Sequence, residues 1–406
     1  AGKVPEMADY DYIILGGGMT AASAAQGIRE VDSKGRIAII GDEGQPPYNR
    51  PPLTKKLWTG KPEDSIWREL PKSNTEIYND CHVVRLDPQA KQLVDGDGNT
   101  YTYHKLLLAT GGRPRKLPFG GDDILYYRTL KDYHTVRDWT GKGATFGIIG
   151  GGFIGSELAA SLAANHEQVI MVFPETGIGA AVYPEDLSNY ITGFFRDKGV
   201  VVHTGVEIQD VQHAGERQVL KTKDGQSFEV DHVIAGIGIR PNIELAKEAG
   251  INIANPEAGG GIQVDEYLRT NQPDIFAAGD VASFYNPYLQ RQMRVEHEDN
   301  ANSMGHIAGL NMSGRQTPYQ HQPFFYSDLF ELGYEAVGEL SSQLETYSDW
   351  KDPYRQGVVY YLKDGKVRGV LLWNTWDQVE AARKIIAAGK TYQPSSELNG
   401  LLPEKA

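Results

Sequence analysis

Residues 11–21 read DYIILGGGMTA, and residues 145–157 read TFGIIGGGFIGSE. Each stretch is a short β-branched run, then the pattern G-x-G-x-x-G/A, then a segment rich in alanine and leucine. In this pattern the glycines let the backbone approach a pyrophosphate, and the N-terminus of the following helix favours its negative charge. The chain is therefore predicted to hold two dinucleotides, a pairing suited to passing a hydride from one ligand to the other.

The segments around the two glycine stretches repeat one βαβ unit. The first copy is predicted as a strand over 12–15, a helix over 21–31 and a strand over 36–40; the second as 144–149, 154–164 and 168–173. Asp42 and Glu175 follow the last strand of each copy, where a carboxylate normally binds ribose hydroxyls. Turns at 95–98 and 223–225 are typical of hairpins. We expect an α/β fold with parallel sheets covered by helices.

The last part of the chain has a different texture. Aromatic-rich strands are predicted over 324–326, 356–362 and 367–373, followed by a helix over 376–388. Residues 341–355 are interpreted as a short acidic and aromatic connector. This pattern indicates an α+β module without a nucleotide fingerprint, and strands near 358–362 are expected to offer an edge to which a partner strand could add.

Composition excludes several classes of function. The net charge of −13 over 406 residues argues against phosphate-driven binding to nucleic acid, which needs a basic face. The single cysteine, Cys81, rules out an intrachain disulfide and a redox-active cysteine pair, and it is interpreted as a small strand-side residue. The longest apolar run, 146–164, is interrupted by glycines and Glu157, so no integral membrane segment is expected. No metal site is expected either.

Three further segments carry a resemblance to a known family. They are the strand 106–108 leading into Ala109-Thr110-Gly111, the strand 270–276 leading into Ala277-Ala278-Gly279-Asp280, and Leu53-Thr54-Lys55. With them the chain resembles the two-dinucleotide flavoproteins of glutathione-reductase architecture. It is further similar to the apoptosis-inducing-factor branch and its bacterial ferredoxin-reductase relatives, through residues 47–58, 150–157, 294–297, 326–329, 370–374 and 382–386.

The resemblance implies a domain plan and an activity. It implies a discontinuous FAD-binding domain over 1–114 and 243–318, an inserted NADH-binding domain over 115–242, and a C-terminal α+β domain over 319–406. The implied activity is an FAD-dependent NADH oxidoreductase, in which hydride passes from NADH to flavin N5. The electrons would go on to an unidentified acceptor: quinone, oxygen or a small redox protein. An alternative of another class is an NADH-responsive redox sensor with slow turnover, whose partner protein docks on the C-terminal domain.

The resemblance also implies site residues. Lys55, Glu157 and His297 would be catalytic, with Lys55 beside the flavin and paired with Glu157. A fixed ammonium there would stabilise the charge of the reduced flavin, and a buried lysine needs a counter-charge. FAD would contact Gly16, Gly18, Ala21, Asp42, Arg50, Lys55, Val83, Thr110, Gly111, Arg128, Asp280, Glu296, His297 and Tyr326. NAD would contact Gly150, Gly152, Phe153, Gly155, Glu157, Glu175 and Gly238. Because Glu175 would repel a 2′-phosphate, NADH should be preferred to NADPH.

The chain departs from the animal members of the branch in ways that limit what carries over. Tyr326 stands where the family has tryptophan, and residues 58–78 lack the long basic insertion of the animal proteins. Binding to nucleic acid is therefore not expected, and an acidic ferredoxin is disfavoured because two acidic surfaces repel. A homodimer formed on reduction is a further expectation. The start near Met7 fits either a native N-terminus or a processed protein, which leaves a cytoplasmic and a mitochondrial location both open.

Overall fold

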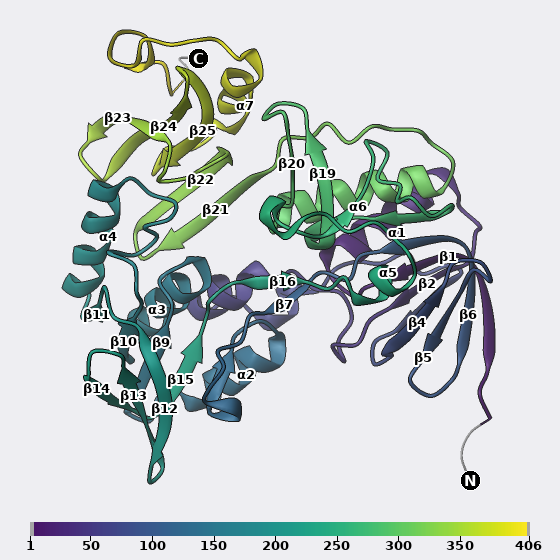
Figure 1. Ribbon diagram of the computed structural model, residues 1–406, viewed down its shortest axis with the longest axis horizontal. Coiled ribbons are helices and arrows are strands. Elements are labelled where there is room, and N and C mark those ends of the chain that lie inside the picture. Colours follow the sequence, from purple (N-terminus) through teal and green to yellow (C-terminus); the bar gives the residue numbers. More distant parts are fainter. Residues whose placement is uncertain (1–3, 404–406) are drawn as a thin grey trace. The chain divides into compact units, whose positions relative to one another are not determined.

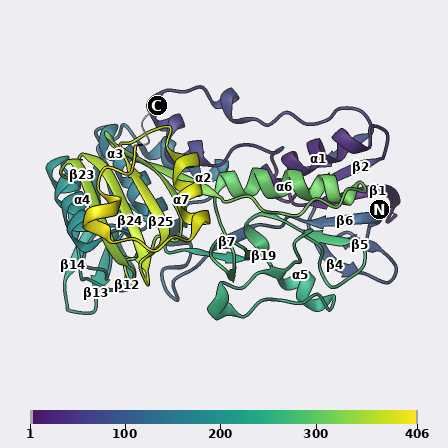
Figure 2. The ribbon, with the colours of Figure 1, turned by 90° about the horizontal axis from the view of Figure 1, so that it is seen from above.

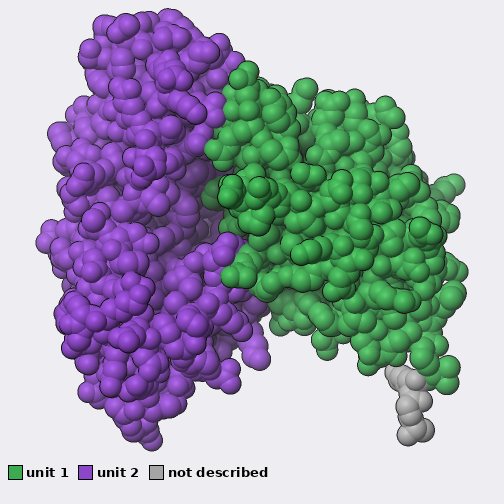
Figure 3. All heavy atoms as spheres, viewed as in Figure 1, with its two compact units in different colours: residues 1–50, 64–113, 240–323 green, residues 51–63, 114–239, 324–406 purple. Residues whose placement is uncertain are grey.

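The computed structural model describes residues 4–403 and divides into two compact units, coloured separately in Figure 3. Unit 1 comprises residues 1–50, 64–113 and 240–323, and unit 2 comprises 51–63, 114–239 and 324–406. The short strands β7 (Gly112–Pro114) and β16 (Ile239–Pro241) form a two-stranded sheet. The outermost residues of the predicted first and last domains, 1–3 and 404–406, lie outside the described residues.

The main sheet of unit 1 has the order β3-β2-β1-β6-β5-β4, with β18 added beside β6. Strands β1, β2, β3, β6 and β18 are parallel, and β4 and β5 continue the sheet as an antiparallel hairpin. The strands are β1 (Met7–Leu15), β2 (Ile37–Ile40), β3 (Thr75–Tyr78), β4 (Val83–Asp87), β5 (Gln92–Asp95), β6 (Thr100–Leu108) and β18 (Ile275–Ala277). All four residues of β2 and the last four of β1 are buried, as expected for parallel strands covered on both faces.

Two helices of unit 1, α1 (Met19–Val31) and α6 (Glu298–Met312), lie side by side in Figures 1 and 2. Their backbones approach closely because glycines face the neighbouring helix. A Cβ at Gly309 would lie 2.2 Å from the Ala24 carbonyl oxygen, and one at Gly305 would lie 2.5 Å from that of Thr20. This contact leaves no room for a larger side chain.

The remainder of unit 1 is a small sheet, of order β17-β19-β20, with short helical segments. The elements are β17 (Ile262–Gln263), β19 (Ala282–Asn286), β20 (Arg291–Met293), α5 (Glu244–Glu248), and 3₁₀ turns η3 (Glu63–Ile66), η5 (Pro256–Ala258) and η6 (Gly279–Val281). The first residue of η3, Glu63, belongs to unit 2.

Unit 2 contains a second parallel sheet, of order β11-β10-β9-β15-β8, next to the antiparallel meander β12-β13-β14. The strands are β8 (Ile124–Tyr126), β9 (Thr145–Ile149), β10 (Gln168–Val172), β11 (Val201–His203), β12 (Ile208–Ala214), β13 (Arg217–Thr222), β14 (Ser227–Val230) and β15 (His232–Ala235). The helices are α2 (Leu130–Trp139), α3 (Phe153–Ala164) and α4 (Glu185–Asp197), and the short turns are η1 (Pro51–Thr54), η2 (Lys56–Thr59) and η4 (Gly121–Asp123).

The C-terminal part of unit 2 is an antiparallel sheet of order β21-β22-β25-β24-β23 with helix α7 against β22 and β25 (Figure 1). The elements are β21 (Phe324–Leu329), β22 (Leu332–Gly338), β23 (Glu345–Asp352), β24 (Gln356–Lys363), β25 (Lys366–Trp373), α7 (Val379–Ala388) and a π-helical turn, η7 (Pro394–Leu398).

Two expectations for this C-terminal sheet were wrong. The segment 341–355, expected to be a connector, contains strand β23, whose pattern ETYSDWKD has too few aliphatic residues to read as a strand. With β23 in place, β24 pairs on both sides, so residues 358–362 do not form an edge of the sheet. The edge strands are β21 and β23.

The predicted fold class is confirmed: both βαβ units, both hairpin turns and the C-terminal α+β module are present. The structure extends the first predicted strand back to Met7 and starts α7 at Val379 rather than 376. The strand before Asp280 covers only 275–277. The second compact unit combines residues 51–63, 114–239 and 324–406. This division does not test the predicted plan of three domains, which stays a prediction.

We expect Gly309→Ala to lower the melting temperature, because its Cβ would overlap backbone atoms of α1. Alanine normally stabilises a helix interior relative to glycine by about 0.5–1 kcal/mol, so a loss here would come from the helix contact. Gly193→Ala in α4, where no atom lies within 4 Å of the added Cβ, is the matched control and should raise the melting temperature slightly. Thermal unfolding followed by circular dichroism measures both, and an equal response of the two variants would contradict the packing argument.

Candidate functional site

The first glycine fingerprint, in unit 1, joins β1 to α1 through a turn that only glycine can make. Gly16 has φ +134°, and a Cβ there would lie 1.9 Å from the Ala109 carbonyl oxygen. At Gly18, the residue before α1, no heavy atom lies within 4 Å of an added Cβ. Ala21, at the third position, is fully buried. The turn therefore leaves open space in front of a helix N-terminus, which fits the pyrophosphate of a dinucleotide.

The second fingerprint, in unit 2, has the same geometry between β9 and α3. Gly150 has φ +121°, and its Cβ would lie 2.2 Å from the Gly236 carbonyl oxygen. Gly152 again faces open space, whereas a Cβ at Gly155 would lie 2.4 Å from the Gly150 carbonyl oxygen. Each unit thus carries one cradle that a side chain would fill, in agreement with a site for one dinucleotide.

Two acidic residues that follow β2 each pair with a basic side chain, and only one of these acids was predicted from the sequence. Arg50 contacts the Glu43 carboxylate at 3.1 Å and donates to the Tyr48 hydroxyl at 3.1 Å. Asp42, the predicted ribose ligand, is exposed and lies 3.3 Å from His82 Nδ1. Glu43, which sequence reasoning missed, is therefore the acid that orients Arg50, and its position next to Asp42 was the one available signal.

The predicted residues at the ends of β6 and β18 are also held in place within unit 1. Thr110 and Asn242 are joined by two hydrogen bonds. Thr110 Oγ1 donates to the Asn242 carbonyl oxygen at 2.9 Å, and Asn242 Nδ2 donates to the Thr110 carbonyl oxygen at 2.8 Å. Gly111 has φ +61° and accepts a hydrogen bond from the Asn242 amide. Asp280 lies in η6, directly after Gly279, whose Cβ would lie 2.3 Å from Thr20 Oγ1 on α1. Asp280 is thus next to the segment that carries the first fingerprint.

The other predicted FAD residues of unit 1 have different environments. Arg294 donates to the Asp280 carbonyl at 2.9 Å and pairs with Glu296 at 2.6 Å. His297 immediately precedes α6, and Val83 is buried at the start of β4.

The reacting groups predicted in unit 2 meet in a buried ion pair. Lys55 Nζ lies 2.7 Å from Glu157 Oε2 and 2.9 Å from Oε1, with side chains 11% and 4% exposed. Lys55 stands between turns η1 and η2, and Glu157 lies in the second turn of α3. The structure thus brings together two residues that are about a hundred positions apart in the sequence.

Hydroxyl groups complete the surroundings of this carboxylate. Ser327 Oγ donates to Glu157 Oε2 at 3.0 Å, and Thr54 Oγ1 lies 3.3 Å from Oε1. Burial raises the pKa of Glu157, while Lys55 and the two hydroxyl donors oppose that rise. Sequence reasoning missed Thr54 and Ser327 as partners of Glu157, although both stand inside motifs that carried the family resemblance.

Aromatic rings border the ion pair. Lys55 Nζ lies 5.3 Å from the centre of the Tyr326 ring, within reach of a cation–π attraction. Phe153, at the start of α3, packs edge to face with Phe325 at 5.5 Å between ring centres, and Phe325 packs in turn against Tyr334 at 6.1 Å. Tyr326 therefore lies beside Lys55, and Phe153 packs against the neighbouring residue Phe325; their roles at the flavin and the nicotinamide stay predictions.

The remaining predicted residues of unit 2 lie outside this cluster. Glu175 is exposed three residues after β10, and its carbonyl accepts from the Gly205 amide. Gly238 has φ +108° against Arg115, and Arg128 stands just before α2, with its amide donating to Asp132.

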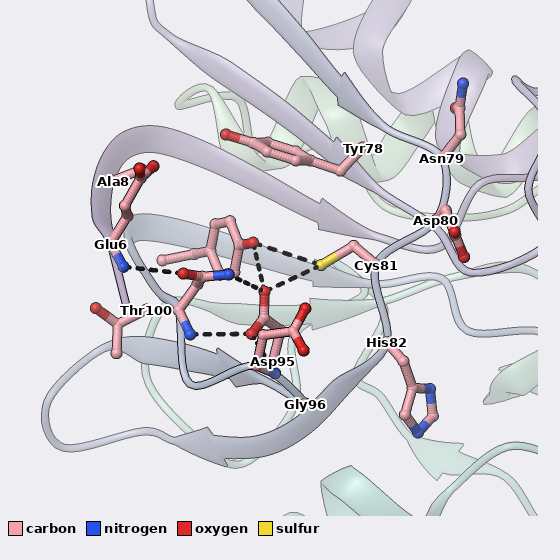
Figure 4. A pocket seen from close by; sticks show the side chains of 13 residues that line it. Glu6, Ala8, Tyr78, Asn79, Asp80, Cys81, His82, Asp95, Gly96 and Thr100 are labelled. Carbon is pink, nitrogen blue, oxygen red and sulfur yellow. Dashed lines mark hydrogen bonds between the residues drawn. The ribbon is translucent and has the colours of Figure 1, made fainter. Parts of the chain in front are cut away.

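Cys81 lies in the turn between β3 and β4, rather than in a strand, and lines a cavity of about 650 Å³ in unit 1 (Figure 4). Its Sγ is 3.7 Å from Asp95 Oδ2 and 3.5 Å from the Tyr101 hydroxyl. Burial raises the pKa of the thiol, so the reactive thiolate is disfavoured. Asp95 itself is held by Tyr101 and by Asn99 of its own turn, which indicates a structural role for the group.

Comparison with known proteins adds to this geometry. A family described as "Pyridine nucleotide-disulphide oxidoreductase" matches residues 10–305. One described as "Apoptosis-inducing factor, mitochondrion-associated, C-term" matches residues 308–352 and 348–388. Within residues 4–403, no helix has both the length and the apolar character needed to cross a membrane.

Similar proteins cover almost the whole chain. Apoptosis-inducing factor 1, mitochondrial, of Dictyostelium discoideum is 36% identical over 437 residues, covering 97% of this chain and 81% of that protein. Putidaredoxin reductase of Pseudomonas putida is 30% identical, with 96% and 94% covered. The solved ferredoxin reductase for the CYP199A2 system of Rhodopseudomonas palustris is 30% identical, has a TM-score of 0.86, and matches over 95% and 96% of the two chains.

The two cradles, the buried lysine–glutamate pair and these matches agree with one another. Redox chemistry through a cysteine pair is excluded by the single cysteine, so the disulphide in the family description does not apply here. The chain belongs to the pyridine nucleotide-disulphide oxidoreductase family, in its apoptosis-inducing-factor-like branch related to bacterial ferredoxin reductases, and is a flavoprotein that uses FAD and NAD(P)H.

Proposed function

We propose that the chain is an NADH-dependent reductase that binds FAD at the first fingerprint and NADH at the second, and passes electrons to a small redox protein. The observation that carries this proposal is the buried ion pair between Lys55 and Glu157, a residue of the helix α3 that follows the first glycines of the second fingerprint. A buried ion pair costs desolvation and gives little net stability, so a functional reason for keeping it is favoured.

The residues that would hold FAD are those around the first cradle, with Arg50 toward the diphosphate and Asp280 toward the ribityl chain. When bound, the flavin supplies the capacity to accept a hydride from NADH and to release electrons one or two at a time. Lys55 would keep a positive charge beside the ring, and Glu157 would hold that ammonium in place.

NADH is favoured over NADPH by the acid at the end of β10. Glu175 is exposed, so its carboxylate is available to a ribose 2′-hydroxyl and would repel a 2′-phosphate.

A small redox protein is favoured as the electron acceptor, because two relatives are named as reductases of such proteins, putidaredoxin and ferredoxin. The net charge of −13 would oppose encounter with an acidic partner at low ionic strength, so a partner with a neutral or basic docking face fits better. Quinone and oxygen remain as competing acceptors in the test.

A second candidate is an NADH-responsive sensor, favoured by the C-terminal module shared with apoptosis-inducing factor. The two functions separate on turnover. A reductase should cycle at about 1 per second or faster with its acceptor, whereas a sensor should retain a long-lived reduced state in air. Anaerobic NADH titration, followed by steady-state oxidation of NADH with a [2Fe–2S] protein, a soluble quinone and oxygen in turn, decides between them.

Replacing the second glycine of each fingerprint should remove one ligand and leave the other. Because a Cβ added at Gly18 or at Gly152 has no heavy atom within 4 Å, we expect Gly18→Val and Gly152→Val to fold normally and to fill ligand space. We expect Gly18→Val to lose FAD on gel filtration, and Gly152→Val to keep FAD but bind NAD⁺ at least about tenfold more weakly, about 1.4 kcal/mol. Absorbance at the flavin band and calorimetric titration measure the two effects. Each variant is the control for the other, and loss of both ligands in either would contradict the assignment.

Glu175→Ala should lower the preference for NADH. The variant loses a charge-assisted hydrogen bond to the ribose and the repulsion of a 2′-phosphate, so the NADH-to-NADPH ratio of flavin reduction rates should fall about tenfold or more. Stopped-flow reduction with each nucleotide measures the ratio. Glu216→Ala removes an exposed acid from the β12–β13 hairpin of the same unit and should leave the ratio unchanged. A parent protein reduced faster by NADPH would overturn the role of Glu175.

Lys55→Met and Glu157→Gln should each slow flavin reduction or lower its midpoint potential, because each breaks the pair and leaves one buried group without its partner. Removing one partner of a buried pair commonly costs about 3–5 kcal/mol of stability, and the double variant should cost less than the two single changes together. The surface pair Lys223–Glu207, at 2.7 Å with side chains 60% and 57% exposed, is the matched control. Its coupling should be about 1 kcal/mol or less. Additive effects of Lys55→Met and Glu157→Gln on reduction would argue against a functional pair.

A further inference from the structure

The Glu157 carboxylate accepts hydrogen bonds from more than its lysine. The Lys55 ammonium reaches both of its oxygens, while Ser327 contacts Oε2 and Thr54 contacts Oε1. The three donors come from two parts of the chain: Lys55 and Thr54 from the η1–η2 segment, and Ser327 from strand β21 of the C-terminal sheet.

The two hydroxyl donors are not equivalent. A hydroxyl has one proton to donate, and Thr54 Oγ1 lies 3.3 Å from both Glu157 Oε1 and the Pro51 carbonyl oxygen, so its proton is divided between two acceptors. Ser327 Oγ is buried and donates to Glu157 Oε2 at the shorter distance of 3.0 Å. Ser327 is therefore the stronger hydroxyl donor to the carboxylate.

We propose that Ser327 is a positioning residue that keeps Glu157 ionised and facing Lys55, so that strand β21 controls the charge of the reaction centre. A donor to the ionised form of a buried carboxylate stabilises that form against protonation. If Glu157 takes up a proton, Lys55 loses its counter-charge in a buried site, and its ammonium is disfavoured as well.

The other titratable groups near Glu157 do not replace this control. Tyr183 and Tyr334 lie close to Glu157 and share a hydroxyl–hydroxyl contact of 2.8 Å, and Tyr334 pairs with Ser327 across strands β22 and β21. Burial raises the pKa of both tyrosines well above the ordinary value, so they stay neutral. The charged side chain that contacts Glu157 within residues 4–403 is that of Lys55.

This inference deepens the proposed function and rests on it for the meaning of the charge, but its test does not depend on turnover. The protonation of Glu157 can be followed directly in the FAD-loaded protein by infrared spectroscopy with ¹³C-carboxyl-labelled glutamate, and Glu157→Gln identifies its signal. If Glu157 titrates as expected but Lys55→Met reduces as fast as the parent protein, the proposed function fails and the positioning role stands.

The experiment compares the Glu157 titration of the parent protein with that of five variants across a pH series. Ser327→Ala removes the donor and should raise the pH at which Glu157 protonates by about one unit or more, the effect of losing a hydrogen bond to a charged group. Ser327→Thr keeps the hydroxyl and should restore the parent value, and Ser327→Cys, with a weak donor, should lie between them. Thr54→Val should give a smaller shift than Ser327→Ala. The pH at half-maximal flavin reduction should move in the same direction.

Asp328→Asn, at the exposed next position of β21, removes a charge without touching Glu157 and should leave the titration unchanged. An unchanged Glu157 titration in Ser327→Ala would overturn the proposal, as would a shift from Asp328→Asn equal to that from Ser327→Ala. If Ser327→Ala does not fold, the order of the threonine and cysteine variants decides, and an equal titration in both overturns the proposal.

Discussion

The close approach of a glycine to the end of a neighbouring strand is the constraint on which both dinucleotide cradles depend. Gly16 lies against Ala109, which follows β6, and Gly150 lies against Gly236, which follows β15. At both glycines, a positive φ angle and the absence of a Cβ let the backbone turn directly from strand to helix beside the neighbouring strand. The turn brings a helix N-terminus to the carboxyl edge of a parallel sheet, where backbone amides and the helix dipole favour a phosphate. Two copies of one local rule thus explain why each unit has one place for a nucleotide.

Where such a local rule exists, the sequence predicted the structure well. Both copies of the βαβ unit are present, with element ends shifted by a few residues, because apolar strands and glycine turns can be recognised from the local sequence alone. Strand β23 was missed for the opposite reason. It is a mostly polar strand at a sheet edge, with aromatic side chains only at Tyr347 and Trp350, and its strand conformation depends on pairing with β24. Because β23 was not predicted, β24 was wrongly expected to be an edge strand, so one undetected strand produced two errors.

The candidate site was predictable to the extent that its residues belong to motifs. Lys55 and Glu157 were paired through family resemblance, and the geometry brings them together. Glu43 and Ser327 were not predicted, because an acid beside Arg50 and a hydroxyl beside Glu157 acquire meaning only through tertiary contacts. Asp42 shows the converse: a residue at the expected position in the sequence whose side chain is exposed. Its role as a ribose ligand depends on the bound nucleotide and stays a prediction.

The surroundings of Glu157 also give a physical reason for the C-terminal module. A carboxylate that is 4% exposed cannot remain ionised on the strength of its own helix, because the favourable field of a helix N-terminus falls off within the first turn. The compensating groups come from η1–η2 and from β21, neither of which belongs to the βαβ unit that carries Glu157. The second cradle therefore needs only its own βαβ unit and the end of β15, whereas the Lys55–Glu157 pair also has a donor from strand β21. In this chain the nucleotide site is local, and the charge beside it is a property of the whole of unit 2.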